Sequence, residues 1–130
     1  MYVAATPLCP LFEAPEEGAQ RVDEILLGWP VSGPEEVRGD WWRIRTHYGY
    51  TGWVRREGLA PAAERPLGEQ MVVTASFADV LAGPEVERPV LTTLPRGSLT
   101  TVREGQAPEG WRRVELPDGR NGYTKGSFLE

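Results

Sequence analysis

The chain contains one cysteine and one histidine, the two residue types that a cysteine peptidase combines. Such an enzyme needs a thiolate with a lowered pKa, often at a helix N-terminus, and an imidazole within reach. Cys9 stands between Pro7 and Pro10, and Pro15 follows too soon for a helix that Pro10 would open to persist. We therefore expect Cys9 to be a small buried apolar residue, and we expect the chain to hold no catalytic residue of its own.

Metal and cofactor chemistry has equally little support in the sequence. One His and one Cys cannot complete a metal site without several carboxylates at suitable spacing. The sequence has no phosphate-binding glycine loop, no His-Glu-x-x-His pair and no Gly-x-Ser-x-Gly elbow. We expect no metal and no cofactor.

Charge and hydropathy restrict the partners and the compartment. The net charge is -5 and the pI is about 5.0, which argues against nucleic acid or an anionic membrane as the main partner. No apolar run approaches the ~20 residues that span a bilayer. The N-terminal residues do not form a signal peptide, and a single Cys fits a reducing compartment. If Met1 is the native start, we expect a cytoplasmic protein.

The most informative stretch runs from Asp40 to Val54 and holds three of the five tryptophans. Trp42, Ile44 and Thr46 alternate with Trp41 and two arginines, which is the period of a strand with one buried face. Tyr48-Gly49 then interrupts the pattern, and glycine supplies the positive φ of a tight turn. This predicts a hairpin with rings on both faces. Because a core needs rings on one face only, the other rings suggest a binding surface.

The same stretch recurs about 70 positions later, so that Trp41, Gly49 and Gly52 match Trp111, Gly119 and Gly122. Upstream, further residues match at an offset of 69, namely Pro15 with Pro84, Ile25 with Leu94 and Gly28 with Gly97. An internal duplication therefore organises the chain. We predict one domain over residues 1–60, a linker over 61–69 rich in Ala and Pro, and a second domain over 70–130.

Frequent Pro and Gly leave little room for long helices, since the chain has 12 of the first and 15 of the second. We expect a first strand within residues 2–12, a second over 20–27 (where a helical turn is the alternative), and a short third strand near Trp29 followed by a polar loop. The hairpin comes next, and each copy closes with a single 3₁₀ turn. The predicted fold class is all-β, with two SH3-like small β-barrels in tandem.

Each copy resembles the bacterial SH3 (SH3b) family. The resemblance rests on the pattern Gly-Trp-x-x-Val, Asp-Gly-x-x-Gly-Trp/Tyr, which the second copy holds at 110–114 and 118–123 and the first copy approaches at 41–54. The tandem layout, with the stretches around Pro10 and Ile25–Val31, more loosely resembles the paired SH3b modules of NlpC/P60 cysteine peptidases, which cut γ-D-glutamyl-diamino acid bonds in cell-wall peptides. The Asp-Cys-Ser-Gly context of their nucleophile is absent from this chain.

This resemblance implies a non-catalytic recognition module of a cell-wall peptide hydrolase. The partners that it implies are a cell-wall peptide with a free N-terminus and an NlpC/P60 catalytic domain outside this chain. The alternative is a stand-alone SH3b protein that binds peptidoglycan or a partner peptide through its aromatic grooves.

Tyr48 is the first candidate for the binding site, because the second copy has Asp118 there, the ordinary residue of such a turn. In the peptidases that the chain resembles, a carboxylate of the early loop and a tyrosine hold the substrate's free amine, and Glu13 and Tyr48 stand where these residues would fall. We predict a ligand-binding set of Glu13, Tyr48, Tyr50 and Trp41. The alternatives stay open: the tryptophans also suit the core of a small barrel, and a single exposed ring is common on protein surfaces.

Overall fold

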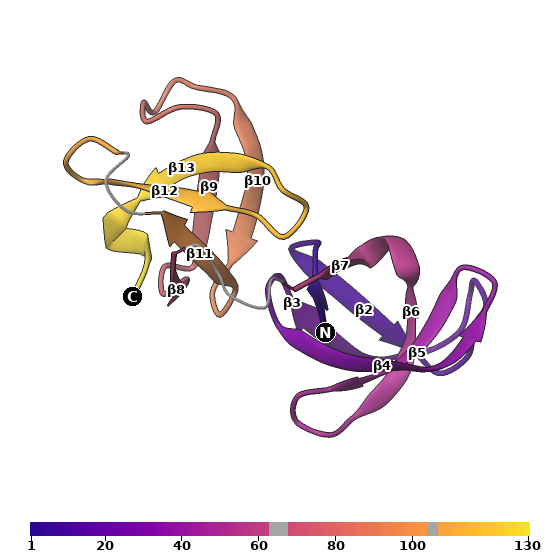
Figure 1. The fold of residues 1–130 in the computed structure, drawn as a ribbon. Helices are drawn as coiled ribbons and strands as arrows, with labels where there is room; N and C mark the ends of the chain where they lie inside the picture. The colour runs from indigo at the N-terminus through magenta and orange to yellow at the C-terminus, as the bar shows by residue number, and fades with distance from the viewer. Residues whose placement is uncertain (63–67, 104–106) are drawn as a thin grey trace. The chain divides into compact units, whose positions relative to one another are not determined.

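A computed structural model describes residues 1–62, 68–103 and 107–130 of the chain (Figure 1). Contacts between Cα atoms divide the chain into two compact units, Met1–Ala62 and Ala63–Glu130. Each unit contains one antiparallel sheet, and the helical segments in the described residues are two 3₁₀ turns of three residues each. The all-β class predicted from the sequence is confirmed.

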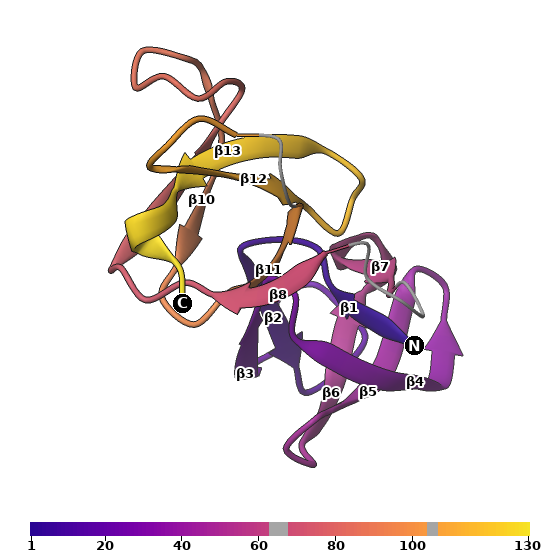
Figure 2. The ribbon, with the colours of Figure 1, turned by 60° about the vertical axis from the view of Figure 1, so that its left-hand side comes forward.

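The first unit is a seven-stranded sheet with the order β3-β2-β6-β5-β4-β1-β7. Figure 2 shows β1 beside both β4 and β7, which are its hydrogen-bonded neighbours. The strands are β1 (Tyr2–Ala4), β2 (Leu8–Phe12), β3 (Arg21–Leu26), β4 (Pro30–Arg38), β5 (Trp41–Thr46), β6 (Thr51–Arg55) and β7 (Leu59–Pro61), and the 3₁₀ turn η1 (Arg56–Gly58) joins β6 to β7.

The core of the first unit follows from the alternation of apolar side chains along its strands. Leu11, Ile25 and Ile44 are almost fully buried, and Val54 meets them from β6. Trp42 packs against this cluster, so that Trp42, Ile44 and Thr46 face inward as the period of two predicted. The hairpin and the closing 3₁₀ turn lie where the sequence predicts them, whereas the single first strand predicted within residues 2–12 is two strands, β1 and β2.

Strand β4 differs from the prediction, because it continues through the segment that the sequence indicates as a polar loop. Its register with β5 shifts between Ser32 and Glu36, and Gly33 in this shift has a φ of 120°. The shift is a β-bulge, in which the chain takes up extra residues and then resumes pairing, so that Val37 lies opposite Trp42. A polar sequence with Gly and Pro therefore remained a strand here.

The second unit is a six-stranded sheet with the order β10-β9-β13-β12-β11-β8. Its strands are β8 (Glu69–Val72), β9 (Phe77–Leu81), β10 (Val90–Pro95), β11 (Leu99–Arg103), β12 (Trp111–Glu115) and β13 (Asn121–Lys125), followed by the 3₁₀ turn η2 (Gly126–Phe128). Val80, Leu94 and Val114 are buried inside it. Among the described residues, the hydroxyl oxygens of Thr100 and Thr124 in the interior have no hydrogen-bond partner. Part of the predicted linker, residues 63–67, lies outside the described residues.

Candidate ligand-binding site

The turn between β5 and β6 is built by short-range backbone bonds around one glycine. The Thr46 amide donates to the Tyr50 carbonyl at 2.7 Å, and the Gly49 amide donates to the Thr46 carbonyl at 3.1 Å. Gly49 has a φ of 91°, the left-handed conformation that the sequence predicts for it. The Thr46 hydroxyl oxygen accepts a bond from the Tyr50 amide at 2.9 Å. The turn therefore holds two exposed tyrosines in defined positions.

Four rings gather at this turn in a chain of edge-to-face contacts. Tyr48 lies at the centre, with ring centroids 4.9 Å from His47, 5.4 Å from Tyr50 and 6.2 Å from Trp29. Trp29 comes from the connection between β3 and β4 and also contacts His47 at 5.3 Å. Perpendicular ring pairs are a favourable arrangement of aromatic quadrupoles. Tyr48 and Tyr50 nevertheless remain 40% and 63% exposed, so the rings present an open apolar surface.

A carboxylate from a distant strand completes the group. The Tyr48 hydroxyl donates to Oδ2 of Asp23 on β3 at 2.7 Å. Burial, together with the hydrogen bond and negative charge of Asp23, raises the pKa of Tyr48 to about 12, although Thr46 acts in the opposite direction. The phenol is therefore neutral near pH 7. We call Asp23, Trp29, His47, Tyr48 and Tyr50 the turn cluster.

Two of the four residues predicted for ligand binding, Tyr48 and Tyr50, lie in the turn cluster. Glu13 follows β2 and is exposed, and its backbone amide donates to the Gln20 carbonyl at 2.9 Å. Within the described residues the Glu13 side chain forms no hydrogen bond or ion pair. The carboxylate that contacts Tyr48 is Asp23, and a ligand-binding role for Glu13 stays a prediction.

Trp41, the fourth predicted residue, lies in a separate ring group. Its indole meets Phe12 edge-on at 5.7 Å and lies under the Arg55 guanidinium, 4.3 Å from the ring centroid. Arg55 also forms an ion pair with Glu17 of the early loop. Trp41 is 8% exposed as a result, so its ring is covered by side chains rather than open to solvent. The rings on the outer face of this hairpin thus stack mainly on arginine.

Sequence reasoning missed three members of the turn cluster, namely Asp23, Trp29 and His47. Nothing in the local pattern separates Asp23 from its acidic neighbour Glu24. A comparison of the two copies could have identified Asp23 and Trp29. Trp29 falls on Ser98 and Asp23 falls on Thr92 in the second copy, so both positions change as Tyr48 changes to Asp118.

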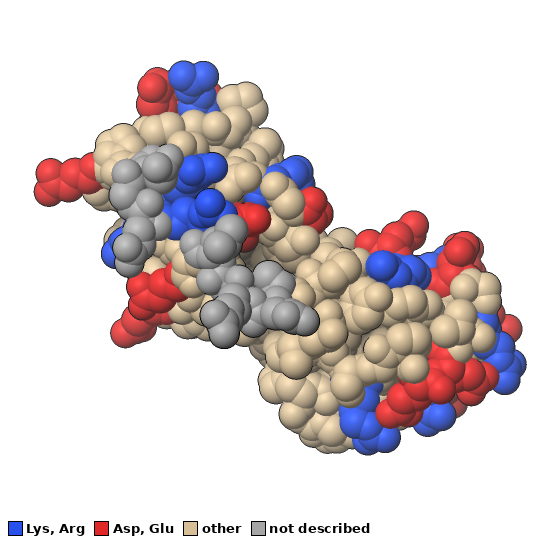
Figure 3. Space-filling view, in the orientation of Figure 1, with Lys and Arg blue, Asp and Glu red and all other residues tan. Residues whose placement is uncertain are grey.

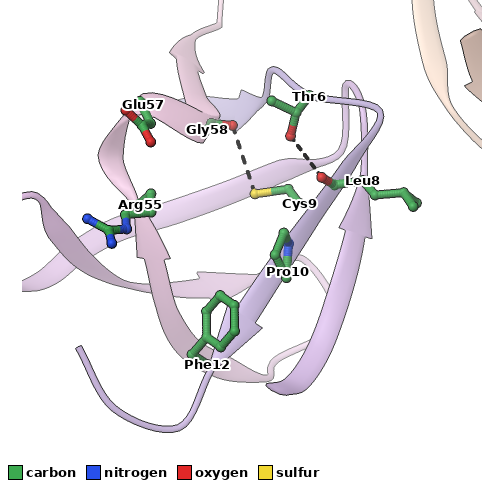
Figure 4. Close-up of a pocket in the computed structure, with 8 residues that line it drawn as sticks. All are labelled: Thr6, Leu8, Cys9, Pro10, Phe12, Arg55, Glu57 and Gly58. Carbon is green, nitrogen blue, oxygen red and sulfur yellow. Dashed lines mark hydrogen bonds between the residues drawn. The ribbon is translucent and has the colours of Figure 1, made fainter. Parts of the chain in front are cut away.

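Cys9 lines an open pocket of about 250 Å³ between β2 and the end of β6 (Figure 4). Pro10 and Phe12 form its apolar wall, and Arg55 lies at its edge. The sulfur points to the Gly58 carbonyl oxygen at 3.9 Å. Burial raises the pKa of the Cys9 thiol to about 11, the reverse of what a nucleophilic thiol requires. Cys9 belongs to the core cluster, as the sequence predicts.

Charged side chains of both signs are interleaved on the face drawn in Figure 3. Arg45 pairs with Glu35 at 3.0 Å and Arg38 with Glu36 at 2.7 Å, both at exposed positions where ion pairs contribute little to stability.

In the described ranges no group of three or more His, Cys, Asp or Glu side chains is arranged to hold a metal ion. No described helix has the length and apolarity needed to cross a membrane.

Comparison with known proteins finds similarity to peptidases. The chain is 33% identical over 125 residues to dipeptidyl-peptidase 6 of Lysinibacillus sphaericus, a match that covers 92% of this chain and 46% of that protein. It is 32% identical over 57 residues to the probable endopeptidase p60 of Listeria innocua, across 44% of this chain and 12% of the relative. The chain thus spans less than half the length of each of these two relatives. No protein-family model matches it.

A solved structure shares the fold. The crystal structure of an NlpC/P60 family protein from Bacillus cereus superposes with a TM-score of 0.80 over 99% of this chain and 55% of that one, at 16% sequence identity. At this identity the likeness concerns the fold alone. The sequence matches relate the chain to two peptidases that are considerably longer than it.

Proposed function

We propose that this chain is a non-catalytic recognition portion of an NlpC/P60-type hydrolase of cell-wall peptides. Its two units act as tandem SH3b modules, over residues 1–60 and 70–130 with a linker between them, and the first module shapes the substrate cleft. The observation that carries the proposal is the similarity to dipeptidyl-peptidase 6, which includes 92% of this chain but only 46% of the enzyme.

The state of Cys9 supports a non-catalytic role. Its thiol is 3% exposed and has a pKa of about 11, so that almost none of it is thiolate near pH 7. His47 lies in the turn cluster, with Trp29 and Tyr48, whereas Cys9 lies in the core. A Cys–His catalytic pair requires the two side chains within hydrogen-bond reach, and these two belong to different clusters.

The turn cluster supports the recognition part of the proposal. Tyr48 and Tyr50 offer exposed ring faces, which attract a cation, and Asp23 adds a negative charge beside them. A peptide's free N-terminal ammonium suits this environment, and the bulk of the rings limits a cleft to short peptides. Glu13, exposed after β2, and Trp41, under Arg55 in a separate ring group, remain in the proposed ligand-binding set.

The test uses a fusion enzyme, in which this chain replaces the matching 125 residues of Lysinibacillus sphaericus dipeptidyl-peptidase 6. We expect the fusion enzyme to hydrolyse L-Ala-γ-D-Glu-diamino acid peptides and to keep its rate after Cys9→Ala. The 130-residue chain alone should show no hydrolysis. Hydrolysis by the chain alone that Cys9→Ala abolishes would overturn the proposal. Tight binding of the chain alone to purified peptidoglycan would favour a stand-alone wall-binding protein instead.

The same thiol gives a second check. Because its pKa is about 11 instead of 9, the Cys9 thiolate fraction near neutral pH should be about a hundredfold below that of the unfolded chain. Alkylation of the folded chain by iodoacetamide at pH 7.5 should therefore be at least about a hundredfold slower than in urea. Equal rates in both states would show that Cys9 is a reactive thiol.

A further inference from the structure

We propose that Asp23 is a positioning residue for Tyr48, which fixes the phenol so that its oxygen can only accept hydrogen bonds from a ligand. This makes the turn cluster selective for a ligand with an ammonium group over one with a neutral or acidic end. The proposal rests on the proposed function, because it takes the turn cluster as the site that meets the peptide N-terminus.

The first support is the geometry of the contact. Asp23 and Tyr48 are 25 positions apart and come from different elements, yet their oxygens are 2.7 Å apart. This is close to the distance of a charge-assisted O–H to carboxylate bond, which is about twice as strong as a neutral one. Edge contacts with Trp29, His47 and Tyr50 hold the same ring from its other sides. The phenol therefore has one favoured orientation before any ligand arrives.

The second support is the count of donors and acceptors. A tyrosine hydroxyl has one donor and two acceptor positions, so a hydroxyl that donates to Asp23 has acceptor capacity left and no donor. Asp23 is itself an acceptor on both oxygens, because Oδ1 takes the Glu24 amide at 2.7 Å. The Tyr48 hydroxyl, held by Asp23, thus shows only acceptor capacity to a ligand. An ammonium supplies up to three donors and a positive charge, whereas an acylated amine supplies one donor and no charge.

The ionisation of Tyr48 fits this arrangement. Burial, the hydrogen bond to Asp23 and the Asp23 charge together raise the Tyr48 pKa to about 12, so the hydroxyl keeps its proton over the physiological range. His47 and Tyr50 are the other titratable side chains in ring contact with Tyr48. The second unit has no counterpart to the pair, because Thr92 aligns with Asp23 and Asp118 aligns with Tyr48.

One test needs no ligand. Tyrosine labelled with ¹³C at Cζ reports the pKa of each of the four tyrosines by NMR, and Tyr48→Phe assigns the Tyr48 signal. In Asp23→Asn the Tyr48 pKa should fall measurably below the value in the unchanged chain, while the part due to burial remains. The matched control is Glu24→Gln, since Glu24 is the neighbouring carboxylate on β3 and pairs with Arg21 instead. A Tyr48 pKa that stays unchanged in Asp23→Asn, or falls equally in Glu24→Gln, would overturn the proposal.

A second test measures selectivity in the fusion enzyme, as the ratio of kcat/KM for a peptide with a free N-terminus to that for its N-acetyl form. Loss of a charge-assisted hydrogen bond predicts that Asp23→Asn and Tyr48→Phe each lower this ratio about tenfold. If Asp23 acts through Tyr48, the double variant should lose no more than Tyr48→Phe alone. Glu24→Gln should keep the ratio.

The outcomes separate this inference from the proposed function. A ratio that falls in Tyr48→Phe and is kept in Asp23→Asn overturns the role of Asp23 and leaves the site in place. Fully additive losses in the double variant show that Asp23 acts directly on the ligand and not by positioning Tyr48. A fusion enzyme with no preference for the free amine at all contradicts the proposed function, and the claim of selectivity with it.

Discussion

The turn between β5 and β6 and the turn between β12 and β13 have the same backbone and different side chains. Gly49 and Gly119 have φ values of 91° and 93°. The amide-to-carbonyl bonds that close the turns are 2.7 Å in the first unit and 2.8 Å in the second. Since the second turn forms without any aromatic residue, the backbone does not need the rings of the first.

In the second turn the Asp118 side chain bonds within the turn itself, and Arg120 also donates to the Leu91 carbonyl of β10 at 3.4 Å. The Arg120 amide donates to Oδ1 of Asp118 at 3.0 Å, and the Arg120 guanidinium meets Oδ2 at 2.7 Å. In the first unit the residue that matches Asp118 is Tyr48, and its hydroxyl donates to the Asp23 carboxylate on another strand. The comparison indicates that the ring residues of the first turn serve a purpose other than closing it.

The two interiors differ in a second way. Val54 of β6 is fully buried in an apolar cluster. The matching residue of β13 is Thr124, which is 1% exposed and whose hydroxyl has no partner in the described part of the chain. Val31 likewise matches Thr100, whose hydroxyl is also unpaired. A buried polar group without a partner costs free energy. The hydrogen bonding of these threonines is therefore incomplete, whereas the valines at the matching positions of the first unit need no partner.

Among the substitutions that test this comparison, Leu11→Ala should have the largest effect on the unfolding free energy. Leu11 is fully buried, and its side chain lies against Gly52, where an added Cβ would be 2.8 Å from the Leu11 Cβ. Removing its methyl groups should cost about 2–5 kcal/mol of unfolding free energy. Urea unfolding followed by tryptophan fluorescence reports mainly the first unit, because four of the five tryptophans precede residue 63. Val80→Ala, at the matching position in the second unit, is the control and should leave most of this signal unchanged.

An exchange at one matching pair tests the difference between the interiors. Thr124→Val removes an unpaired buried hydroxyl and should stabilise the second unit by about 1 kcal/mol, while Val54→Thr should destabilise the first by about 1–3 kcal/mol. The two variants are read by amide hydrogen exchange, which separates the units residue by residue. A loss of protection in the second unit on Thr124→Val would show that the hydroxyl has a partner in solution.

The smallest predicted stability effect concerns the two turns. Asp118→Ala removes the Arg120 contacts and should cost about 0.5–1 kcal/mol in the second unit, since exposed ion pairs contribute little. Tyr48→Ala removes three ring contacts and one hydrogen bond, and should cost the first unit about 1–2 kcal/mol. Thermal unfolding of both variants checks the order. A Tyr48→Ala chain far less stable than this would indicate that the rings are structural.

Much of the fold was predictable because local chemistry determines it. The hairpins are indicated by the alternation in Trp41–Thr46, by the glycine at position 49 and by the recurrence of both in the second copy. Both hairpins form as predicted. The long strand β4 was not predictable from propensity. Gly33 and Pro34 are typical of a loop, and it is pairing with β5 across a bulge that keeps the segment extended.

The candidate site was predictable only in part. Tyr48 and Tyr50 were found because they depart from an ordinary turn, which is a local signal. Asp23 and Trp29 reach the same place through sheet topology, and a sequence pattern does not show which carboxylate a ring 25 positions away will meet. Glu13 was chosen by resemblance, and within the ranges that the structure describes its side chain forms no hydrogen bond or ion pair that would test the choice.

The most direct test of the central claim compares the two turns within one enzyme. In the fusion enzyme, we would measure kcat/KM for a cell-wall peptide with a free N-terminus and for its N-acetyl form, in Tyr48→Ala and in the matched control Asp118→Ala. A charge-assisted contact predicts that Tyr48→Ala lowers the preference for the free amine by about tenfold to a hundredfold, while Asp118→Ala keeps it. An unchanged preference in Tyr48→Ala, or an equal loss in both variants, would contradict the assignment of the ligand site to the first turn.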